Sequence, residues 1–349
     1  MLTEAGPSLI VRQAELALAR VLSLRFTEPL LLPVSQSPVV PPAPRPFIGL
    51  IQVSASGILW GTGGLAVVLV NRYADLSALT ITAYRAAIAT VILVAAVVVL
   101  RRTASVRVVL SRHLVRAIVV GVLMGLMQWL FFVAVIAVGV TVATVVTLGI
   151  APVLMTGVTV ARTRSAPSLR EAVVVLAALV GLVLVAGSSG SGVTGPQPVL
   201  GVIMALASGA AFAAGTDTGT PLARGADPLA VTTVTTTIAA LGLIPVALIT
   251  VSVSGGTIAA TDPTALLVLL YMGAITMALA YGLLYAGLRT TSSSTAVIAI
   301  LLEPVTAAVV ATLFLGEVLR PAGIVGGVLI LLALAGSGRT QRSPLEMSH

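Results

Sequence analysis

The chain has 349 residues, of which 58% are hydrophobic and 9% charged, and its mean hydropathy is +1.14. Soluble domains carry roughly 25% charged residues, so this composition excludes a water-soluble globule and predicts an integral membrane protein. The net charge of +8 comes from arginines in short segments between apolar runs, a pattern that indicates membrane topology rather than nucleic-acid binding.

The residues at the N-terminus differ from the rest of the chain. Residues 9–26 can form an amphipathic helix at a membrane interface, and the proline-rich segment that follows is expected to be extended. Arginines interrupt the apolar stretch, so a cleavable signal peptide fits poorly. We therefore expect residues 1–47 to form a tail that is disordered or interfacial.

Ten apolar runs follow the tail, each close to the length of about 20 residues that a helix needs to cross the hydrocarbon core. The predicted spans are 48–70, 76–100, 115–136, 139–161, 170–187, 199–220, 228–252, 265–287, 293–315 and 321–337. The uncharged segment 188–198 divides them into two groups of five, 48–187 and 199–338, and residues 339–349 form a short tail. The predicted fold is an all-α polytopic membrane protein.

The arginines between the spans alternate strongly from one side to the other. With the N-terminus inside, the inner segments hold Arg101, Arg102, Arg107, Arg112, Arg116, Arg162, Arg164, Arg170, Arg224, Arg289, Arg339 and Arg342. The outer segments hold only Arg72 and Arg320. Because cytoplasmic loops are enriched in Lys and Arg, both termini are expected to face the cytoplasm, in a multi-pass protein of the cell inner (plasma) membrane.

The two groups of spans match one another at a constant offset of 152 residues. Arg72-x-Ala-Asp75 aligns with Arg224-x-Ala-Asp227, and Pro152-Val aligns with Pro304-Val. An odd number of spans in each half makes the second half enter the membrane in the opposite orientation. Inverted repeats of this kind are a recurrent architecture of secondary transporters, with the substrate site near the midplane.

Particular motifs add a family resemblance that covers roughly residues 48–338. The run LLEPVTAAVVATLFLGEVLRPAGIVGGVLILLALAG at 301–336 resembles the closing helix pair of EamA-type transporters of the drug/metabolite transporter superfamily. ASGILWGTGG and AYRAAIA resemble that family's first and second helices. The resemblance implies export of small metabolites or amino acids by alternating access.

The sequence departs from the family pattern in two respects. Ala151 replaces the acid beside Pro152, and the first half lacks the glutamate of the GE turn. Small multidrug pumps of the same superfamily use a carboxylate in the first helix for proton coupling, and residues 48–70 contain none. That coupling mechanism is therefore not implied for this chain.

Ionisable residues inside spans are costly and usually face a cavity or a partner. Arg85 and Glu303 are expected at similar depths, about 13 Å from the outer start of one span and about 15–18 Å from the inner start of the other. They can form a structural ion pair or contact the substrate. Glu317 lies near an outer interface, and Asp217 is expected at a hydrated helix end.

Further candidates for the cavity wall are two amides and three aromatic residues: Gln52, Gln128, Trp60, Trp129 and Tyr281. Helix packing is an alternative role for each of them. Pro152 and Pro304 cannot donate helical hydrogen bonds, so they are predicted to kink their helices and to expose a carbonyl acceptor.

The predicted function is a secondary transporter that binds a small-molecule substrate in a central cavity between the repeats, within the lipid bilayer, with protons as one candidate coupling ion. A channel-like facilitative permease and a non-transporting scaffold are the alternatives. An intramembrane enzyme fits poorly, because the spans contain no Cys or His and only scattered acids. No catalytic residue, metal site or cofactor is predicted.

Overall fold

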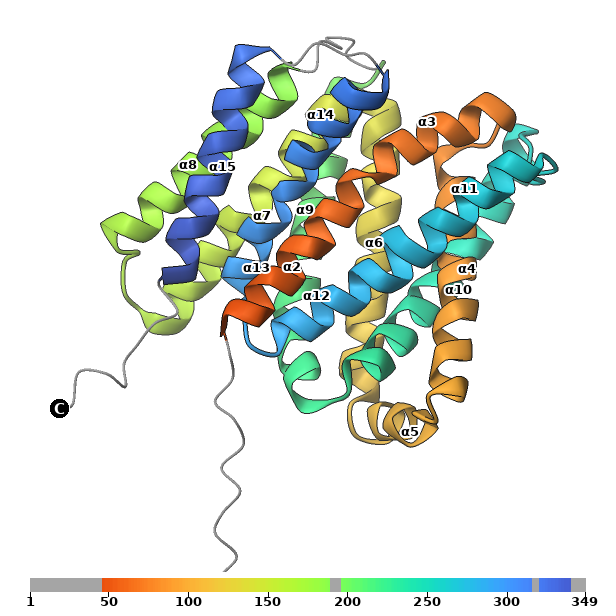
Figure 1. The fold of residues 1–349 in the computed structure, drawn as a ribbon, viewed down its shortest axis with the longest axis horizontal. Coiled ribbons are helices and arrows are strands. Elements are labelled where there is room, and N and C mark those ends of the chain that lie inside the picture. The colour runs from red at the N-terminus through yellow and green to blue at the C-terminus, as the bar shows by residue number, and fades with distance from the viewer. Residues whose placement is uncertain (1–45, 189–195, 316–319, 340–349) are drawn as a thin grey trace, which may run out of the picture. The chain divides into compact units, whose positions relative to one another are not determined.

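The computed structural model describes residues 46–188, 196–315 and 320–339, and these residues are almost entirely helical (Figure 1). The helices of the first half are α2 (Pro46–Gly61), α3 (Gly63–Tyr73), α4 (Ala78–Val99), α5 (Thr103–Arg112), α6 (Leu114–Val138), α7 (Val140–Thr163) and α8 (Leu169–Ser188). Those of the second half are α9 (Pro198–Gly225), α10 (Pro228–Ser254), α11 (Pro263–Gly273), η1 (Ala274–Leu279), α12 (Ala280–Leu288), α13 (Ser293–Ile300), α14 (Leu302–Leu315) and α15 (Pro321–Arg339).

The predicted membrane fold is confirmed. Within the described ranges, nine helical stretches are long and apolar enough to cross a bilayer, and the shorter apolar helix Pro321–Ser337 is the tenth. Their bounds follow the ten predicted spans to within a few residues. The predictions for residues 1–45, for Glu317 and for residues 340–349 fall outside the described ranges.

Three of the spans contain an irregularity that the hydropathy pattern did not predict. The first is interrupted at Thr62, within Gly-Thr-Gly-Gly, where the Thr62 hydroxyl donates to the Leu59 carbonyl over 2.7 Å. The eighth contains the π-helix η1. The ninth is interrupted at Leu301, three residues before Pro304, whereas α7 continues through Pro152. The two prolines that the repeat aligns therefore differ in local structure.

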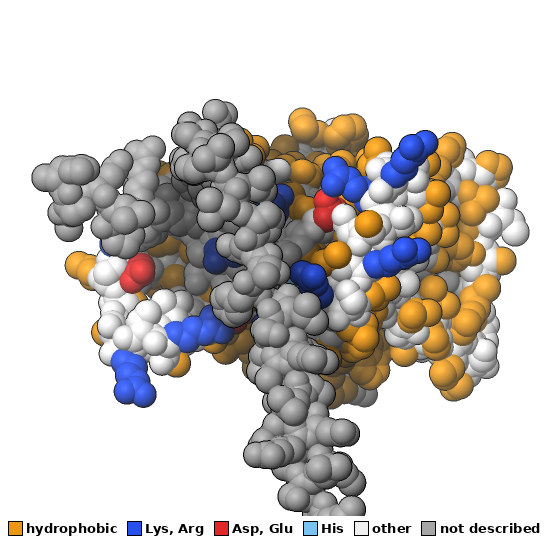
Figure 2. Space-filling model, turned by 90° about the horizontal axis from the view of Figure 1, so that it is seen from below, with side chains coloured by type: hydrophobic (Ala, Val, Ile, Leu, Met, Phe, Trp, Pro, Cys, Tyr) orange, Lys and Arg blue, Asp and Glu red, His pale blue; other side chains and the backbone are white. Residues whose placement is uncertain are grey.

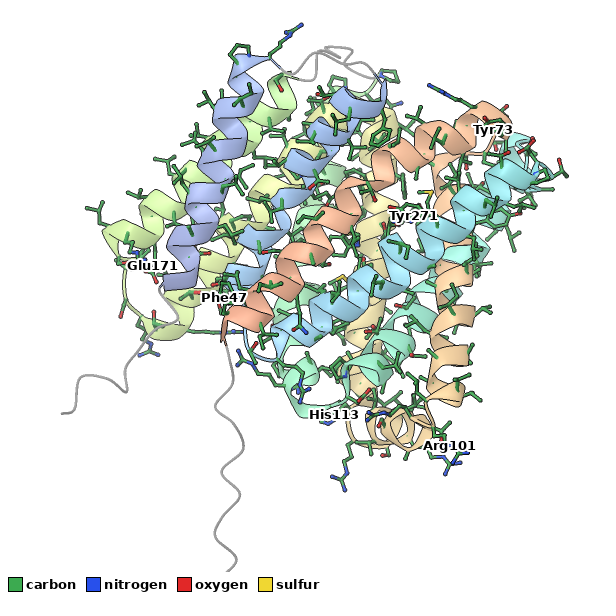
Figure 3. The ribbon with its side chains drawn as sticks, in the orientation of Figure 1. Phe47, Tyr73, Arg101, His113, Glu171 and Tyr271 are labelled. Carbon is green, nitrogen blue, oxygen red and sulfur yellow. The ribbon has the colours of Figure 1, made fainter. Side chains whose placement is uncertain are left out.

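The helices end in two opposite groups, and the arginines gather at one of them. At this arginine-rich end, Arg102 at the start of α5 pairs with Asp227 at the start of α10 over 3.3 Å, and Arg170 of α8 donates to the Gly336 carbonyl of α15 over 3.0 Å. Figure 2 views this end and shows blue side chains spread over it. In Figure 3, Arg101 and His113 lie here beside α5, and Tyr73 lies at the opposite end.

The arginine-rich segment between the second and third spans contains the helix α5. It lies across the ends of the neighbouring spans rather than along them (Figure 1). Val109 is fully buried in the core of the bundle, and Arg107 and Arg112 are exposed. Burial of this valine and packing of α5 on α10 stabilise the segment, since a helix of ten residues is marginal by itself.

The contacts between helices follow the inverted repeat. The third span packs on the sixth (α6 on α9), and the equivalent eighth packs on the first (α12 on α2 and α11 on α3). The fourth packs on the sixth (α7 on α9), and the ninth packs on the first (α13 and α14 on α2). The pairs α4–α10 and α8–α15 each join a span to its own equivalent. This is the pattern that a two-fold relation between the halves produces.

Close approaches at glycine repeat the same relation at the level of single residues. Gly57 abuts Ala299 and Ile300, and its equivalent Gly209 abuts Thr147, which is the equivalent of Ala299. Small residues let helix backbones approach closely within a membrane, where packing rather than the hydrophobic effect drives association. These two glycines therefore fix the first and sixth spans against the ninth and fourth.

Candidate functional site

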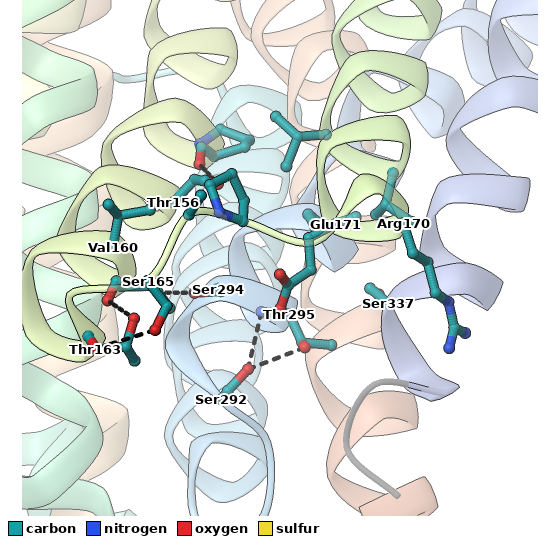
Figure 4. A pocket seen from close by; sticks show the side chains of 17 residues that line it. Thr156, Val160, Thr163, Ser165, Arg170, Glu171, Ser292, Ser294, Thr295 and Ser337 are labelled. Carbon is teal, nitrogen blue, oxygen red and sulfur yellow. Dashed lines mark hydrogen bonds between the residues drawn. The ribbon is translucent and has the colours of Figure 1, made fainter.

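A cavity of about 510 Å³ opens between the two repeats at the arginine-rich end (Figure 4). Its walls come from α7 and α8 of the first half and from α13 and α15 of the second. Hydroxyl groups dominate the polar lining, which comprises Thr156, Thr159, Thr163, Ser165, Ser292, Ser294, Thr295 and Ser337 together with Arg170 and Glu171. The volume falls within the range of about 300–1,000 Å³ that small-molecule sites occupy.

The sequence places this cavity through three local features. Pro152 stands at its inner part, so the cavity runs from the 164–168 loop to about the middle of α7. Ser168 and Glu171 form a reciprocal cap at the start of α8, in which the Ser168 amide donates to the Glu171 carboxylate over 2.8 Å. Arg170 caps the end of α15 through the Gly336 carbonyl. Both charges at the mouth thus have partners within the protein.

The cavity and the predicted charged pair are separate. Arg85 and Glu303 are partly buried and lie within electrostatic range of one another, but neither lines the cavity, and they make no direct ion pair in the described part of the chain. The Nε of Arg85 is enclosed and has no hydrogen-bond partner. The two side chains thus lie in one region, in agreement with their similar predicted depths, but they form no ion pair.

An aromatic cluster lies next to this charged region. The Trp60 ring packs edge-on against Tyr281, with centroids 5.0 Å apart, and against Phe212 at 6.3 Å. Tyr281 also lies within electrostatic range of Arg85. The cluster therefore joins α2, α9 and α12 at the centre of the bundle. We refer to Trp60, Phe212 and Tyr281 as the aromatic centre.

The remaining predicted residues lie in three different environments. Gln128 lines a small gap of about 10 Å³ with Tyr281 and Tyr285, and this gap has room for about one water molecule. Gln52 is partly buried on α2 and lines neither cavity. Trp129 is 40% exposed, so it is not grouped with its repeat equivalent Tyr281. Of the predicted kink residues, only Pro152 lines the larger cavity.

Beside the cavity is an ion pair that was not predicted from the sequence. Arg162 of α7 donates two hydrogen bonds to Asp217 of α9, over 3.0 and 2.6 Å, and the Ser293 hydroxyl donates to the same carboxylate over 3.1 Å. Asp217 is therefore a junction of three helices rather than the expected hydrated helix end. The sequence signal for this pair was an aspartate within a predicted span of one half and an arginine at the inner end of a span of the other half.

The described residues contain no group of three or more His, Cys, Asp and Glu side chains that could hold a metal ion. The polar chemistry that they do present is a hydroxyl-lined cavity, a partly buried charged region and an ion pair between the halves. Together with two inverted five-helix repeats, this arrangement defines a polytopic protein of the secondary-transporter architecture.

The chain belongs to the EamA-like transporter family, whose model matches residues 47–187 and again residues 199–339. The two matched segments begin 152 residues apart, at the offset that the internal alignment predicted. The duplication and the family resemblance are both confirmed by this finding.

Two individual proteins are similar to the chain, one over part of its length and the other over most of it. The uncharacterized transporter YwfM of Bacillus subtilis (strain 168) is 35% identical over 136 residues, which span 39% of this chain and 44% of that relative. A solved crystal structure aligns with a TM-score of 0.68 over 84% of this chain and 99% of its own, at 17% identity. The second likeness shows the fold alone.

Proposed function

We propose that this protein is a secondary transporter that exports small metabolites or amino acids by alternating access, with the substrate passing between the two repeats. The observation that carries the proposal is the hydroxyl-lined cavity, because one of its walls comes from the first half of the inverted repeat and the other from the second. In such proteins, rocking of one repeat against the other exposes a central site to each side in turn. The arginine bias indicates that the cavity opens to the cytoplasm.

The lining supports a polar substrate of modest size. Eight hydroxyl side chains line the cavity, and most of them donate to oxygens of the protein, as Thr156 does to Pro152, so they offer a substrate mainly acceptor oxygens. No lining charge lacks a partner in the protein. Apolar groups such as Val174 and Ile298 complete the wall. A small metabolite with several polar groups, amino acids included, suits this surface.

The test is uptake and counterflow in proteoliposomes across a panel of metabolites, with a matched pair of variants. Thr156→Phe fills the cavity, whereas Val153→Phe adds the same ring at a position on α7 that is 44% exposed and outside the lining. We expect Thr156→Phe to abolish saturable counterflow and Val153→Phe to retain it. Equal transport by the two variants would place the substrate path elsewhere.

We also propose Glu303 as the group that couples transport to protons, since it is a partly buried acid within a span that lies near Arg85 without an ion pair, whereas Asp217 is held by Arg162. Glu303→Gln should then lose accumulation driven by a pH gradient while it keeps counterflow, which needs no gradient. If both activities survive in Glu303→Gln, transport is facilitative or driven through another group.

A further inference from the structure

The ion pair between Arg162 and Asp217 lies beside the interface between α7 and α13, which we call the α7–α13 seam. Thr159 and Ser294 contact each other across this seam, with hydroxyl oxygens 3.5 Å apart, and both line the cavity. Arg162 and Ser293 are their near neighbours in α7 and α13, but they bind Asp217 of α9 instead. The cavity is therefore on one side of the α7–α13 seam and Asp217 is on the other.

The aromatic centre is on the Asp217 side of the seam. Phe212 precedes Asp217 by five residues in α9, which is about 7.5 Å along a helix. Phe212 is also 1% exposed and packs against Trp60. A molecule that moved from the cavity to the aromatic centre would have to pass between α7 and α13.

The Arg162–Asp217 ion pair has the properties of a contact that opens and closes. It joins the first half to the second through one carboxylate, which accepts three hydrogen bonds. The Arg162 side chain is 66% exposed and that of Asp217 is 17% exposed, so water can replace the arginine when the helices part. A fully buried pair would oppose that separation far more strongly.

From these observations we infer that Arg162, Asp217 and Ser293 form an inter-repeat latch that controls passage from the cavity to the aromatic centre. The inference rests on the proposed transport function. With the latch closed, as here, α7 is held against α9 and α13. Release of Asp217 lets the α7–α13 seam open, so the latch sets the balance between a closed and an open state.

The experiment measures access to the buried interior of α9 beside the aromatic centre, and the absence of cysteine from the chain makes it simple. Ala213→Cys places a single thiol in α9, at a position that is 2% exposed and adjacent to Phe212. Its rate of reaction with a water-soluble maleimide, added to full-length protein in nanodiscs, reports the open state. The readout needs no substrate, so it can fail or succeed independently of the transport assay.

Arg162→Gln is expected to raise the labelling rate about two- to fivefold, the order by which a solvent-exposed ion pair made in only one state shifts a population. The matched control is Arg102→Gln, which breaks a second ion pair between the halves among the described residues. Its arginine is 56% exposed and lies outside the cavity lining. The control should label as slowly as the parent. Equal rates for the parent and both variants would overturn the latch.

Two further variants separate a latch from general loss of structure. Ser293→Ala removes one hydrogen bond and leaves the ion pair, so it should raise the rate less than Arg162→Gln does. The exchanged pair, Arg162→Asp with Asp217→Arg, should return the rate toward that of the parent. An exchanged pair that labels as fast as Arg162→Gln would refute the latch, because the charge interaction would then not govern access.

Discussion

The glycine contacts give the sharpest test of how the halves are held together. Gly209 lies where a side chain would meet the Thr147 backbone and the Ile150 side chain of α7. Gly209→Ala therefore forces α9 and α7 apart, and overpacking of this kind costs about 1–3 kcal/mol. Gly242 provides the control, because it lies in α10 with open space around it.

The two substitutions share one term that cancels in the comparison. Each replaces a helical glycine by alanine, which favours the helix by about 0.5–1 kcal/mol. The difference between the variants is then the packing cost alone. We expect Gly242→Ala to be as stable as the parent or more so, and Gly209→Ala to be less stable than Gly242→Ala by about 1–3 kcal/mol.

The assay is reversible unfolding in mixed micelles with increasing SDS, followed by circular dichroism, with all variants at one protein concentration. Gly57→Ala extends the test to the other half, because the added carbon would lie 3.1 Å from the Ile300 Cα. It should destabilise in the same direction. If Gly209→Ala and Gly242→Ala unfold together, the close approach of α9 and α7 does not contribute to stability as argued.

Three further outcomes follow from local geometry. Gly139→Ala should destabilise by about 1–2 kcal/mol, because this residue joins α6 to α7 with φ +92° and alanine is strained there; SDS unfolding checks it. Asp262→Ala should cost about 1 kcal/mol, since its carboxylate caps α11 by accepting from Thr264 and Ala265; Asp262→Asn should recover most of this in the same assay. Trp129→Phe should transport like the parent in counterflow, whereas Trp60→Ala should be impaired, because Trp60 packs in the aromatic centre and Trp129 is exposed.

The sequence predicts the spans and their symmetry well because both depend on long stretches of residues. Runs of about 20 apolar residues are required by bilayer thickness, and a repeat accumulates evidence along its whole length. The inverted relation follows from the odd number of spans and from Arg72 and Arg224, and the helix contacts agree with it. Details within a span, such as the interruptions at Thr62 and Leu301, depend on local packing that hydropathy does not record.

The site was harder to predict because its residues are ordinary ones. Threonines and serines line the cavity, and hydroxyls are common in membrane helices, where they bond to their own backbone, as Thr156 does to Pro152. Nothing in the chain distinguishes Thr156 from Thr250, which makes the same type of bond. The rare residues attracted attention instead, and of these Pro152 alone lines the cavity while Arg85 and Glu303 lie apart from it.

The asymmetry between the halves connects the observations into one mechanism. In a perfect inverted repeat, the states open to either side would have equal free energy, so preference for one state requires differences between equivalent positions. The described residues supply such differences at Glu303, whose equivalent is Ala151, and at Arg85, whose equivalent is Thr237. Another is the bridge to Asp217, whose equivalent is Leu65, an apolar residue that cannot accept a hydrogen bond from its side chain. The latch can therefore form at the arginine-rich end alone, which is the end where the cavity opens.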